Sequence, residues 1–443
     1  MPSPTYHIKT FGCQMNVSDS ERLATFLEER GLRETSSAEE AALVIINTCG
    51  VRQMAEDRVY SFAHKIRTRN YRAKIIITGC IAHRKDVQRR LQKKADLFTE
   101  IKKFPQSIAD ILHQLSDANL KIQKNFPDKE ELAYLSINPK HANPFQAYVP
   151  IMTGCNNFCA YCVVPYARGR EVSRDAKEVV AEVSALVKKG YKLITLLGQN
   201  VNSYSSKLQN QKEGEINFAK LLGMLDEIPG KFWLTFVSSH PKDMSDELIE
   251  TISKSQKVCE AVHLPLQSGS DDVIRRMNRH YTQKHYLQLI RKIRTAFAQN
   301  KPHAPLAITT DIIVGFPGES RAEFLETKKV MDLSRFDMAY FGQFSPRPGT
   351  AAWNMPNDVS RQEKEKREKE LNDVLLETAL ANNAQLLGKK LDVLIEKKAG
   401  NFYCGKTRAL KNIRIRTKKV IPLGEFVQVE IVKILPFSLE AKI

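Results

Sequence analysis

The chain has 443 residues, of which 42% are hydrophobic and 27% are charged. This composition is typical of a folded globular protein and excludes a disordered or fibrous one, and the length predicts about three domains. Lys and Arg (68) outnumber Asp and Glu (50), which gives a formal net charge of +18. Such an excess of positive charge favours a polyanionic partner such as RNA or DNA.

No apolar run approaches the roughly 18 residues of a membrane-spanning helix, and the N-terminal residues lack the charged and apolar regions of a signal peptide. We therefore expect a cytoplasmic protein with no membrane partner. In a reducing compartment, its eight cysteines are expected to be metal ligands or buried residues rather than disulfides. Positive charge is concentrated in residues 65–74, 84–94 and 406–419, and this clustering indicates a nucleic-acid partner.

Residues 1–118 have the pattern of a parallel α/β domain. Apolar segments of strand length alternate with segments of helical periodicity, and strands are expected at residues 6–11, 42–46 and 74–78. Cys13, Cys49 and Cys80 each follow one of these strands. Because the carboxyl ends of parallel strands meet at one edge of a sheet, the three thiols are expected to converge on a shared metal centre. The alternative is three small buried hydrophobic residues.

Residues 119–144 are polar and contain Asn, Pro and Lys, which predicts a linker. In residues 145–378 strands again alternate with helices, and the strands are expected to end at Thr153, Leu197, Val237, Leu264, Val314 and Phe344. Separations of roughly 30 to 50 residues suit strand-plus-helix crossover units, and six such units predict a barrel or an open part of one. From about residue 358, alternating charges predict a solvent-exposed connector helix.

Cys155, Cys159 and Cys162 form a C-x3-C-x2-C motif directly after the first expected strand of this barrel. Thiolates at this spacing select an iron–sulfur cluster or zinc. A structural zinc site needs four ligands, and no fourth Cys or His lies at usable local spacing in the sequence. Three ligands would leave one iron of a 4Fe-4S cube open to a substrate, and an unrelated zinc knuckle is the alternative.

Residues 379–443 predict a small β-barrel, with short strands expected at residues 391–396, 413–417 and 426–432. The basic segment 406–419 lies within it. A small basic β-barrel at a chain end is typical of an RNA-binding appendage, whose contacts with phosphates position the RNA. The side chains expected to contact RNA are Lys406, Arg408, Arg414 and Arg416 in this segment, and Arg168 and Arg170 after the cysteine motif.

Nine short segments are together similar to segments of one known enzyme family. They are residues 10–16 (TFGCQMN), 47–49 (NTC), 78–80 (TGC), 154–159 (GCNNFC), 166–171 (YARGRE), 197–202 (LGQNVN), 263–270 (HLPLQSGS), 311–319 (DIIVGFPGE) and 344–350 (FSPRPGT). With these segments nearly the whole chain resembles the radical S-adenosylmethionine methylthiotransferases. The resemblance implies an α/β fold with an N-terminal parallel α/β domain, a central partial (βα)6 radical S-adenosylmethionine barrel and a small C-terminal β-barrel similar to a TRAM domain.

The resemblance also implies S-adenosylmethionine and two 4Fe-4S clusters as cofactors. The cluster on the C-x3-C-x2-C cysteines would bind S-adenosylmethionine at its open iron, and one-electron cleavage would give a 5′-deoxyadenosyl radical that attacks an unactivated C2–H bond. The auxiliary cluster, on the three N-terminal cysteines, would present the methylated sulfur. The residues that would contact S-adenosylmethionine are Tyr161, Gln199, Asn200, Ser239 and Gln267.

Within the family, Gln14-Met15-Asn16 and Asn156-Asn157-Phe158 are most similar to the branch that acts on adenosine 37 of tRNA. This implies sulfur insertion and methylation at C2 of N6-isopentenyl (dimethylallyl) adenosine, with the anticodon stem-loop as the substrate. The implied partners are an electron donor such as flavodoxin or ferredoxin and a supplier of sulfur or clusters, and we expect a monomer. The alternatives are the same chemistry on N6-threonylcarbamoyladenosine in tRNA or on an aspartate of a small-subunit ribosomal protein, or a non-catalytic iron–sulfur or zinc RNA-binding protein.

Overall fold

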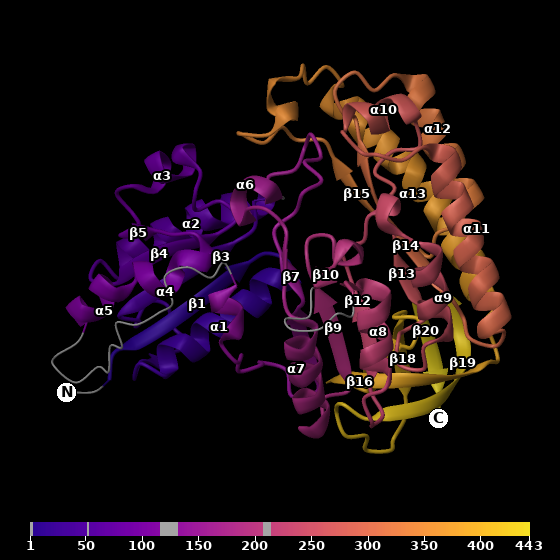
Figure 1. Ribbon diagram of the computed structural model, residues 1–443, viewed down its shortest axis with the longest axis horizontal. Helices are drawn as coiled ribbons and strands as arrows, with labels where there is room; N and C mark the ends of the chain where they lie inside the picture. The colour runs from indigo at the N-terminus through magenta and orange to yellow at the C-terminus, as the bar shows by residue number, and fades with distance from the viewer. Residues whose placement is uncertain (1–2, 51–52, 116–131, 207–213) are drawn as a thin grey trace.

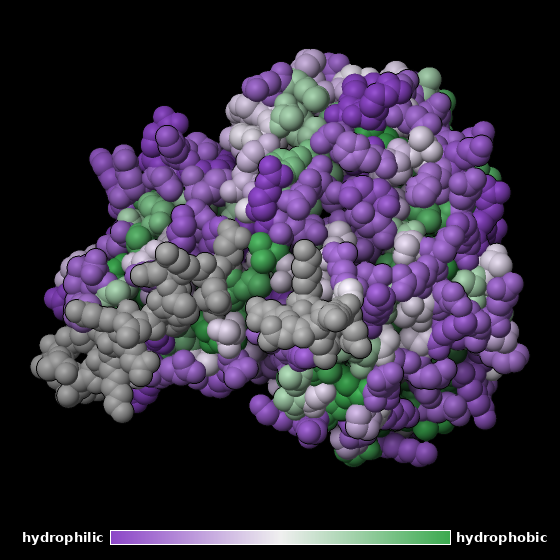
Figure 2. All heavy atoms as spheres, viewed as in Figure 1, coloured by the Kyte–Doolittle hydropathy of each residue, from purple (hydrophilic) through white to green (hydrophobic). Residues whose placement is uncertain are grey.

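The computed structural model describes residues 3–50, 53–115, 132–206 and 214–443. The predicted linker at residues 119–144 lies outside the described residues as far as residue 131. Figure 1 shows an N-terminal α/β domain beside a larger central domain, with a C-terminal β-barrel against the lower end of the central domain in this view. Hydrophilic side chains cover most of the face seen in Figure 2. Within the described residues, no helix is long and apolar enough to cross a membrane.

The N-terminal domain is a parallel sheet of five strands in the order β2-β1-β3-β4-β5. Its strands are β1 (Thr5–Phe11), β2 (Arg33–Glu34), β3 (Leu43–Thr48), β4 (Lys74–Gly79) and β5 (Leu97–Phe98). The three strands expected from the sequence are therefore confirmed. The edge strands β2 and β5 have two residues each, too few to give a recognisable apolar run.

Helices cover both faces of this sheet. Leu43 and Ile45 of β3 pack in one buried cluster with α1 (Gln14–Glu28), whereas Val44 and Ile46 pack in another with α2 (Gln53–Arg69). Because successive side chains of a strand point to opposite faces, a wholly apolar β3 is what a sheet covered on both faces requires. The remaining helices of the domain are α3 (Lys85–Leu91), α4 (Phe104–Ser107) and α5 (Ala109–Leu115).

The central domain is an open barrel of six parallel strands in two sheets, β6-β9-β12 and β13-β14-β15. A parallel bridge between Leu234 and Val258 connects the two halves. The strands are β6 (Gln146–Pro150), β9 (Leu193–Leu197), β12 (Trp233–Phe236), β13 (Ala261–His263), β14 (Ala307–Val314) and β15 (Met338–Gln343). The first strand ends three residues earlier than expected, because β7 (Met152–Thr153) leaves the barrel and pairs antiparallel with β8 (Val172–Ser173).

Helices surround the barrel and cover a large apolar core. The helices of the central domain are α6 (Val164–Arg168), which lies towards the N-terminal domain, α7 (Ala176–Lys188), α8 (Phe218–Asp226), α9 (Asp246–Lys254), α10 (Asp271–Arg276), α11 (Gln283–Asn300), α12 (Arg321–Ser334) and α13 (Arg361–Ala384). The expectation that the charged connector helix is solvent-exposed is wrong for one face of α13. Lys364 donates to the Phe344 carbonyl at 3.0 Å, and buried Arg367 pairs with Glu319 at 2.7 Å.

The C-terminal domain is a closed barrel in the order β16-β17-β18-β20-β19. Its strands are β16 (Lys390–Ala399), β17 (Phe402–Thr407), β18 (Asn412–Arg416), β19 (Phe426–Leu435) and β20 (Ser438–Lys442). It docks at the amino ends of the central strands, where the Phe426 and Trp233 rings lie 4.7 Å apart. A salt bridge of 2.9 Å between Arg408 and Glu260 adds a charged contact beside this apolar one. The C-terminal barrel therefore packs against the amino-end side of the central barrel.

Candidate active site

The N-terminal cysteines lie at one edge of the sheet, as their positions after parallel strands predict. The amide of Cys49 donates to the Phe11 carbonyl at 2.7 Å, and the amide of Cys80 donates to the Thr48 carbonyl at 2.7 Å. These bonds continue the ladders β1–β3 and β3–β4 past the strand ends. The ladder therefore fixes the backbones of Cys49 and Cys80 relative to β1, from which Cys13 follows directly.

A buried amide network holds the Cys13 loop against β3. The Asn16 side chain accepts from the Cys13 amide at 3.2 Å and donates to the Asn47 side chain at 3.0 Å, and Asn47 in turn donates to the Ser20 hydroxyl at 2.9 Å. Sequence patterns predict no role for Asn16 and Asn47 beyond their place in the segments that resemble the family. Their function follows only from the register that places β1 beside β3.

The C-x3-C-x2-C loop begins at Gly154, which has a positive φ of 79°. A Cβ at this position would lie 1.9 Å from the Arg170 carbonyl, so the close approach requires glycine. The far end of the loop is tied to the segment after α10, because Asn278 donates to the Phe158 carbonyl at 2.9 Å and the Ala160 amide donates to the Met277 carbonyl at 2.9 Å.

Arg279 lies beside this loop, and the sequence analysis did not predict it as a site residue. Its guanidinium donates to the Tyr161 hydroxyl at 3.1 Å and to the Pro265 carbonyl at 3.2 Å, and lies 3.7 Å from Cys159 Sγ. Burial raises the pKa of Tyr161, which therefore stays a phenol and accepts the bond from Arg279. A lone arginine carries no spacing signal, so only the fold could reveal a buried positive charge next to the cysteines.

Both cysteine sets line one cavity of about 730 Å³, to which all three domains contribute side chains. Of the predicted S-adenosylmethionine contacts, the cavity is lined by Tyr161, Gln199, Ser239 and Gln267. Asn200 lies outside this lining, and its side-chain amide donates to Asp243 at 2.7 Å.

Among the described residues that line the cavity, several have a buried polar atom without a hydrogen bond, and these include Gln199 Oε1 and Ser239 Oγ. A buried polar atom without a hydrogen bond costs about 1–3 kcal/mol. These atoms therefore fit a site whose polar ligand supplies the missing partners. Both atoms belong to residues predicted to contact S-adenosylmethionine.

The donor chemistry of the two cysteine sets is that of iron–sulfur ligands, because thiolates bind the irons of such clusters. Among the described residues, no group of three His, Cys, Asp or Glu side chains is placed to hold a single metal ion. Burial raises the pKa of the thiols of Cys80, Cys155 and Cys162, so a cluster that binds them must displace their protons.

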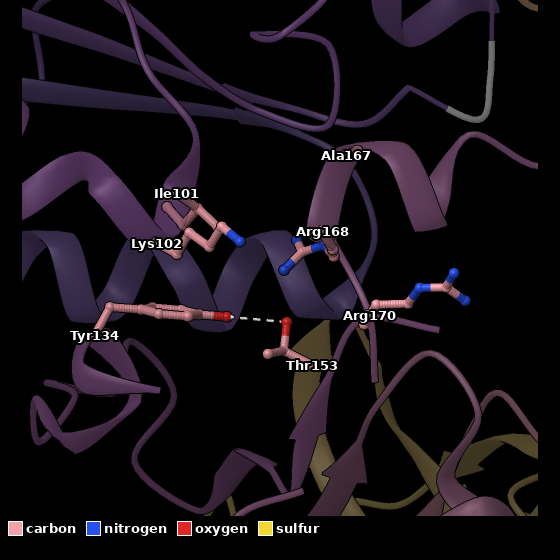
Figure 3. A pocket seen from close by; sticks show the side chains of 7 residues that line it. All are labelled: Ile101, Lys102, Tyr134, Thr153, Ala167, Arg168 and Arg170. Carbon is pink, nitrogen blue, oxygen red and sulfur yellow. Dashed lines mark hydrogen bonds between the residues drawn. The ribbon is translucent and has the colours of Figure 1, made fainter. Parts of the chain in front are cut away.

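Arg168 and Arg170 have different surroundings, although both were expected to hold RNA phosphates. Arg168 is buried and pairs with Asp19 of α1 at 2.7 Å, and it also lies beside the Cys80 thiol. Figure 3 shows its guanidinium pointing towards Lys102, whereas Arg170 points the other way. Arg170 is exposed and lies over the Phe158 ring, 4.5 Å from its centroid. Arg168 therefore joins two domains, and only Arg170 presents its charge to solvent.

The four basic residues of the C-terminal barrel that were expected to contact RNA also differ in their surroundings. Arg414 and Arg416 are exposed on β18, and Lys406 lines the cavity. Arg408 contacts Glu260 and donates to the Val258 carbonyl at 3.1 Å, so its charge is used in docking the barrel.

Family models match all three parts of the chain. They are described as Radical SAM superfamily (residues 149–331), Uncharacterized protein family UPF0004 (residues 5–100) and TRAM domain (residues 384–443). Among solved structures, the chain is similar to the radical S-adenosylmethionine methyltransferase TsrM from Kitasatospora setae with cobalamin and a [4Fe-4S] cluster bound. The TM-score is 0.55 at 12% identity over 79% of this chain and 74% of that one, a likeness of fold alone.

Curated relatives match nearly the whole chain, and three of them share the name tRNA-2-methylthio-N(6)-dimethylallyladenosine synthase. The protein from Thermoanaerobacter pseudethanolicus is 41% identical over 99% of this chain and 92% of its own length. That from Caldicellulosiruptor saccharolyticus is 41% identical over 97% and 90%, and that from Clostridium perfringens 37% identical over 100% and 98%. The chain therefore belongs to the tRNA-2-methylthio-N6-dimethylallyladenosine synthase family of radical S-adenosylmethionine enzymes.

Proposed function

We propose that this chain inserts sulfur at C2 of N6-dimethylallyladenosine at position 37 of tRNA and methylates it. The observation that carries the proposal is the single cavity lined by two cysteine triads from different domains. A structural metal site closes its coordination shell, whereas two three-ligand sets facing one cavity suit two clusters that act on one substrate. The shared name of the relatives supports the choice of base.

As a radical S-adenosylmethionine enzyme, the chain uses S-adenosylmethionine and a 4Fe-4S cluster, which we assign to Cys155, Cys159 and Cys162. We assign a second 4Fe-4S cluster to Cys13, Cys49 and Cys80. When bound, these groups supply radical and sulfur chemistry that no side chain provides. The assignment of the second cluster to the three N-terminal cysteines is supported by their shared position in the cavity lining.

The protein's own residues position the reactants and exclude water. Arg279 places a positive charge beside Cys159 and fixes the Tyr161 hydroxyl, which supports a role for Tyr161 at the cofactor. Gln199 and Ser239 offer their unpaired oxygens to the polar groups of S-adenosylmethionine. Residues of the C-terminal barrel also line the cavity, and such enclosure by protein limits the access of water to reactive species.

We further propose that exposed Arg170, Arg414 and Arg416, with Lys406 at the cavity, contact phosphates of the anticodon stem-loop. Such contacts set the position of the RNA without reading its sequence. An electron donor such as flavodoxin or ferredoxin and a supplier of sulfur complete the proposed set of partners.

The test is anaerobic turnover of an anticodon stem-loop carrying N6-dimethylallyladenosine at position 37, with S-adenosylmethionine and a reductant. Mass spectrometry of the digested RNA should find the 2-methylthio nucleoside. Cys13→Ala should still release 5′-deoxyadenosine but form no methylthio product, whereas Cys155→Ala should do neither. A wild-type protein that modifies only RNA carrying N6-threonylcarbamoyladenosine, or that modifies no RNA, would contradict the proposal.

A further inference from the structure

Arg279 is a buried arginine whose charge no carboxylate balances among the residues that the structure describes. Only 7% of the residue is exposed, and its guanidinium donates to two tyrosine hydroxyls, to a backbone carbonyl and to Cys159 Sγ. Phenols and free thiols are neutral at neutral pH. Among these partners, only a metal-bound Cys159 thiolate could therefore balance the positive charge.

Other buried arginines of this protein are paired. A carboxylate lies within 3.2 Å of the guanidinium in Arg22, Arg84, Arg168, Arg174 and Arg367. Arg168 is the closest comparison, since it lies beside Cys80 of the N-terminal set but pairs with Asp19. Because burial of an unpaired charge is costly, Arg279 requires an anion beside it that the described side chains do not supply.

The backbone at the end of α10 holds Arg279 against the C-x3-C-x2-C loop. The Asn278 amide donates to the Arg275 carbonyl at 2.9 Å, and the Arg279 amide donates to the Ile274 carbonyl at 3.0 Å. Asn278 has the positive φ of 55° that closes such a helix end. Its side chain donates to the Phe158 carbonyl at 2.9 Å. The end of the helix and the cysteine loop are therefore joined directly.

Hydrogen bonds also fix the direction in which the guanidinium points. Nε donates to the Tyr281 hydroxyl at 3.0 Å, and Nη2 donates to the Pro265 carbonyl at 3.2 Å. The remaining nitrogen, Nη1, lies 3.1 Å from the Tyr161 hydroxyl and 3.7 Å from Cys159 Sγ. All three nitrogens of the planar group are thus held, and one of them faces the thiol.

A 4Fe-4S cube on three thiolates is an anion, and one-electron reduction makes it more negative. The reduction potential of such a cluster depends on its net charge, on hydrogen bonds to its sulfurs and on its exposure to solvent. Arg279 offers Cys159 both a positive charge and a hydrogen bond, at a site where burial limits screening by water. A fixed positive charge there stabilises the reduced form more than the oxidised form.

We propose that Arg279 raises the reduction potential of the cluster on Cys155, Cys159 and Cys162 through its charge and its hydrogen bond to Cys159 Sγ. Arg279 acts through a cluster ligand and is therefore a positioning residue. The electron donor loses one electron, the cluster gains it, and no bond of the protein forms or breaks. This inference rests on the cluster assignment in the proposed function and adds the residue that assists entry of the electron.

A redox titration tests the proposal without turnover. The parent is the full chain with Cys13→Ala, Cys49→Ala and Cys80→Ala, reconstituted anaerobically without S-adenosylmethionine so that one cluster is observed. The electron paramagnetic resonance signal of the reduced cluster gives its midpoint potential. Arg279→Gln should shift the reduction equilibrium towards the oxidised form by about tenfold to a hundredfold, which is a fall of about 60 to 120 mV. Arg279→Lys keeps the charge and should show a much smaller fall.

Arg275→Gln in the same parent is the matched control. It removes an arginine charge from α10 whose side chain is 74% exposed and pairs with Asp272 at 2.6 Å. Water and salt screen such a charge, so this variant should keep the midpoint potential of the parent. Iron and sulfide analysis reports whether each variant holds its cluster, and Arg279→Met replaces Arg279→Gln if the latter does not.

Equal falls in Arg279→Gln and Arg279→Lys would show an effect of packing rather than charge, and loss of iron from all Arg279 variants would show a structural role. Either result would overturn the proposal. An unchanged potential with weaker binding of S-adenosylmethionine would assign the charge to the carboxylate of that cofactor and overturn it too. A parent with no 4Fe-4S signal refutes the cluster assignment in the proposed function, whereas a cluster whose potential is independent of residue 279 refutes this inference alone.

Discussion

At the scale of single residues, the cavity wall contains a histidine that burial keeps neutral. Burial, together with the positive charges of Arg279, Lys242 and His280, lowers the pKa of His240 from 6.5 to about 2. The neutral ring accepts a hydrogen bond from the Lys242 amide at 3.2 Å. The unfolded chain therefore binds more protons than the folded one between these two pKa values, and this residue makes the fold less stable as pH falls below about 6.5.

His240→Asn keeps an acceptor for the Lys242 amide and removes the titrating ring. Between pH 7.5 and 5.5, wild-type protein should lose about 1.4 kcal/mol more unfolding free energy than the variant, because pH 5.5 is one unit below the unfolded pKa. Urea denaturation of both proteins without clusters at the two pH values measures this difference. Equal losses would show that the ring is protonated in the folded state.

At the scale of elements, the N-terminal domain is locked to the central barrel through α1. Asp19 of α1 pairs with Arg168 at the end of α6, with both side chains nearly fully buried. Arg22, one turn further along α1, pairs with Glu182 of α7 at 3.2 Å. Because Arg168 also lies beside Cys80, this contact fixes the position of the N-terminal cysteines relative to the C-x3-C-x2-C loop.

Replacing one partner of this buried pair leaves the other charge unpaired. Arg168→Met and Asp19→Leu should each reduce the unfolding free energy by about 3–5 kcal/mol, and the double variant should recover most of the loss. Denaturant unfolding of the three variants and the wild type forms the cycle. Additive losses in the double variant would mean that the two side chains do not interact.

The same elements show what the sequence could and could not predict. The strands and the convergence of Cys13, Cys49 and Cys80 follow from local apolar runs and parallel order, both of which the sequence contains. The burial of Arg168 depends on α1 of another domain, which no local pattern reveals. For the same reason, the alternating charges at the start of α13 correctly predicted a helix but did not predict that Lys364 and Arg367 are buried.

At the scale of the whole molecule, three domains enclose one cavity. The N-terminal domain contributes one cysteine triad, the central barrel contributes the other together with most of the wall, and the C-terminal barrel contributes further lining residues. The proposed reaction requires that the radical source and the sulfur source both reach the same base. A cavity shared by the three domains of the folded chain allows this.

The most direct test of this account is the iron and sulfide content of anaerobically reconstituted protein. Wild type should bind about eight irons and eight sulfides per chain, as two 4Fe-4S clusters. The triple variants Cys13→Ala/Cys49→Ala/Cys80→Ala and Cys155→Ala/Cys159→Ala/Cys162→Ala should each keep about four of each. A wild type with only four irons, all lost in the second variant, or with zinc in their place, would contradict two separate clusters on one cavity.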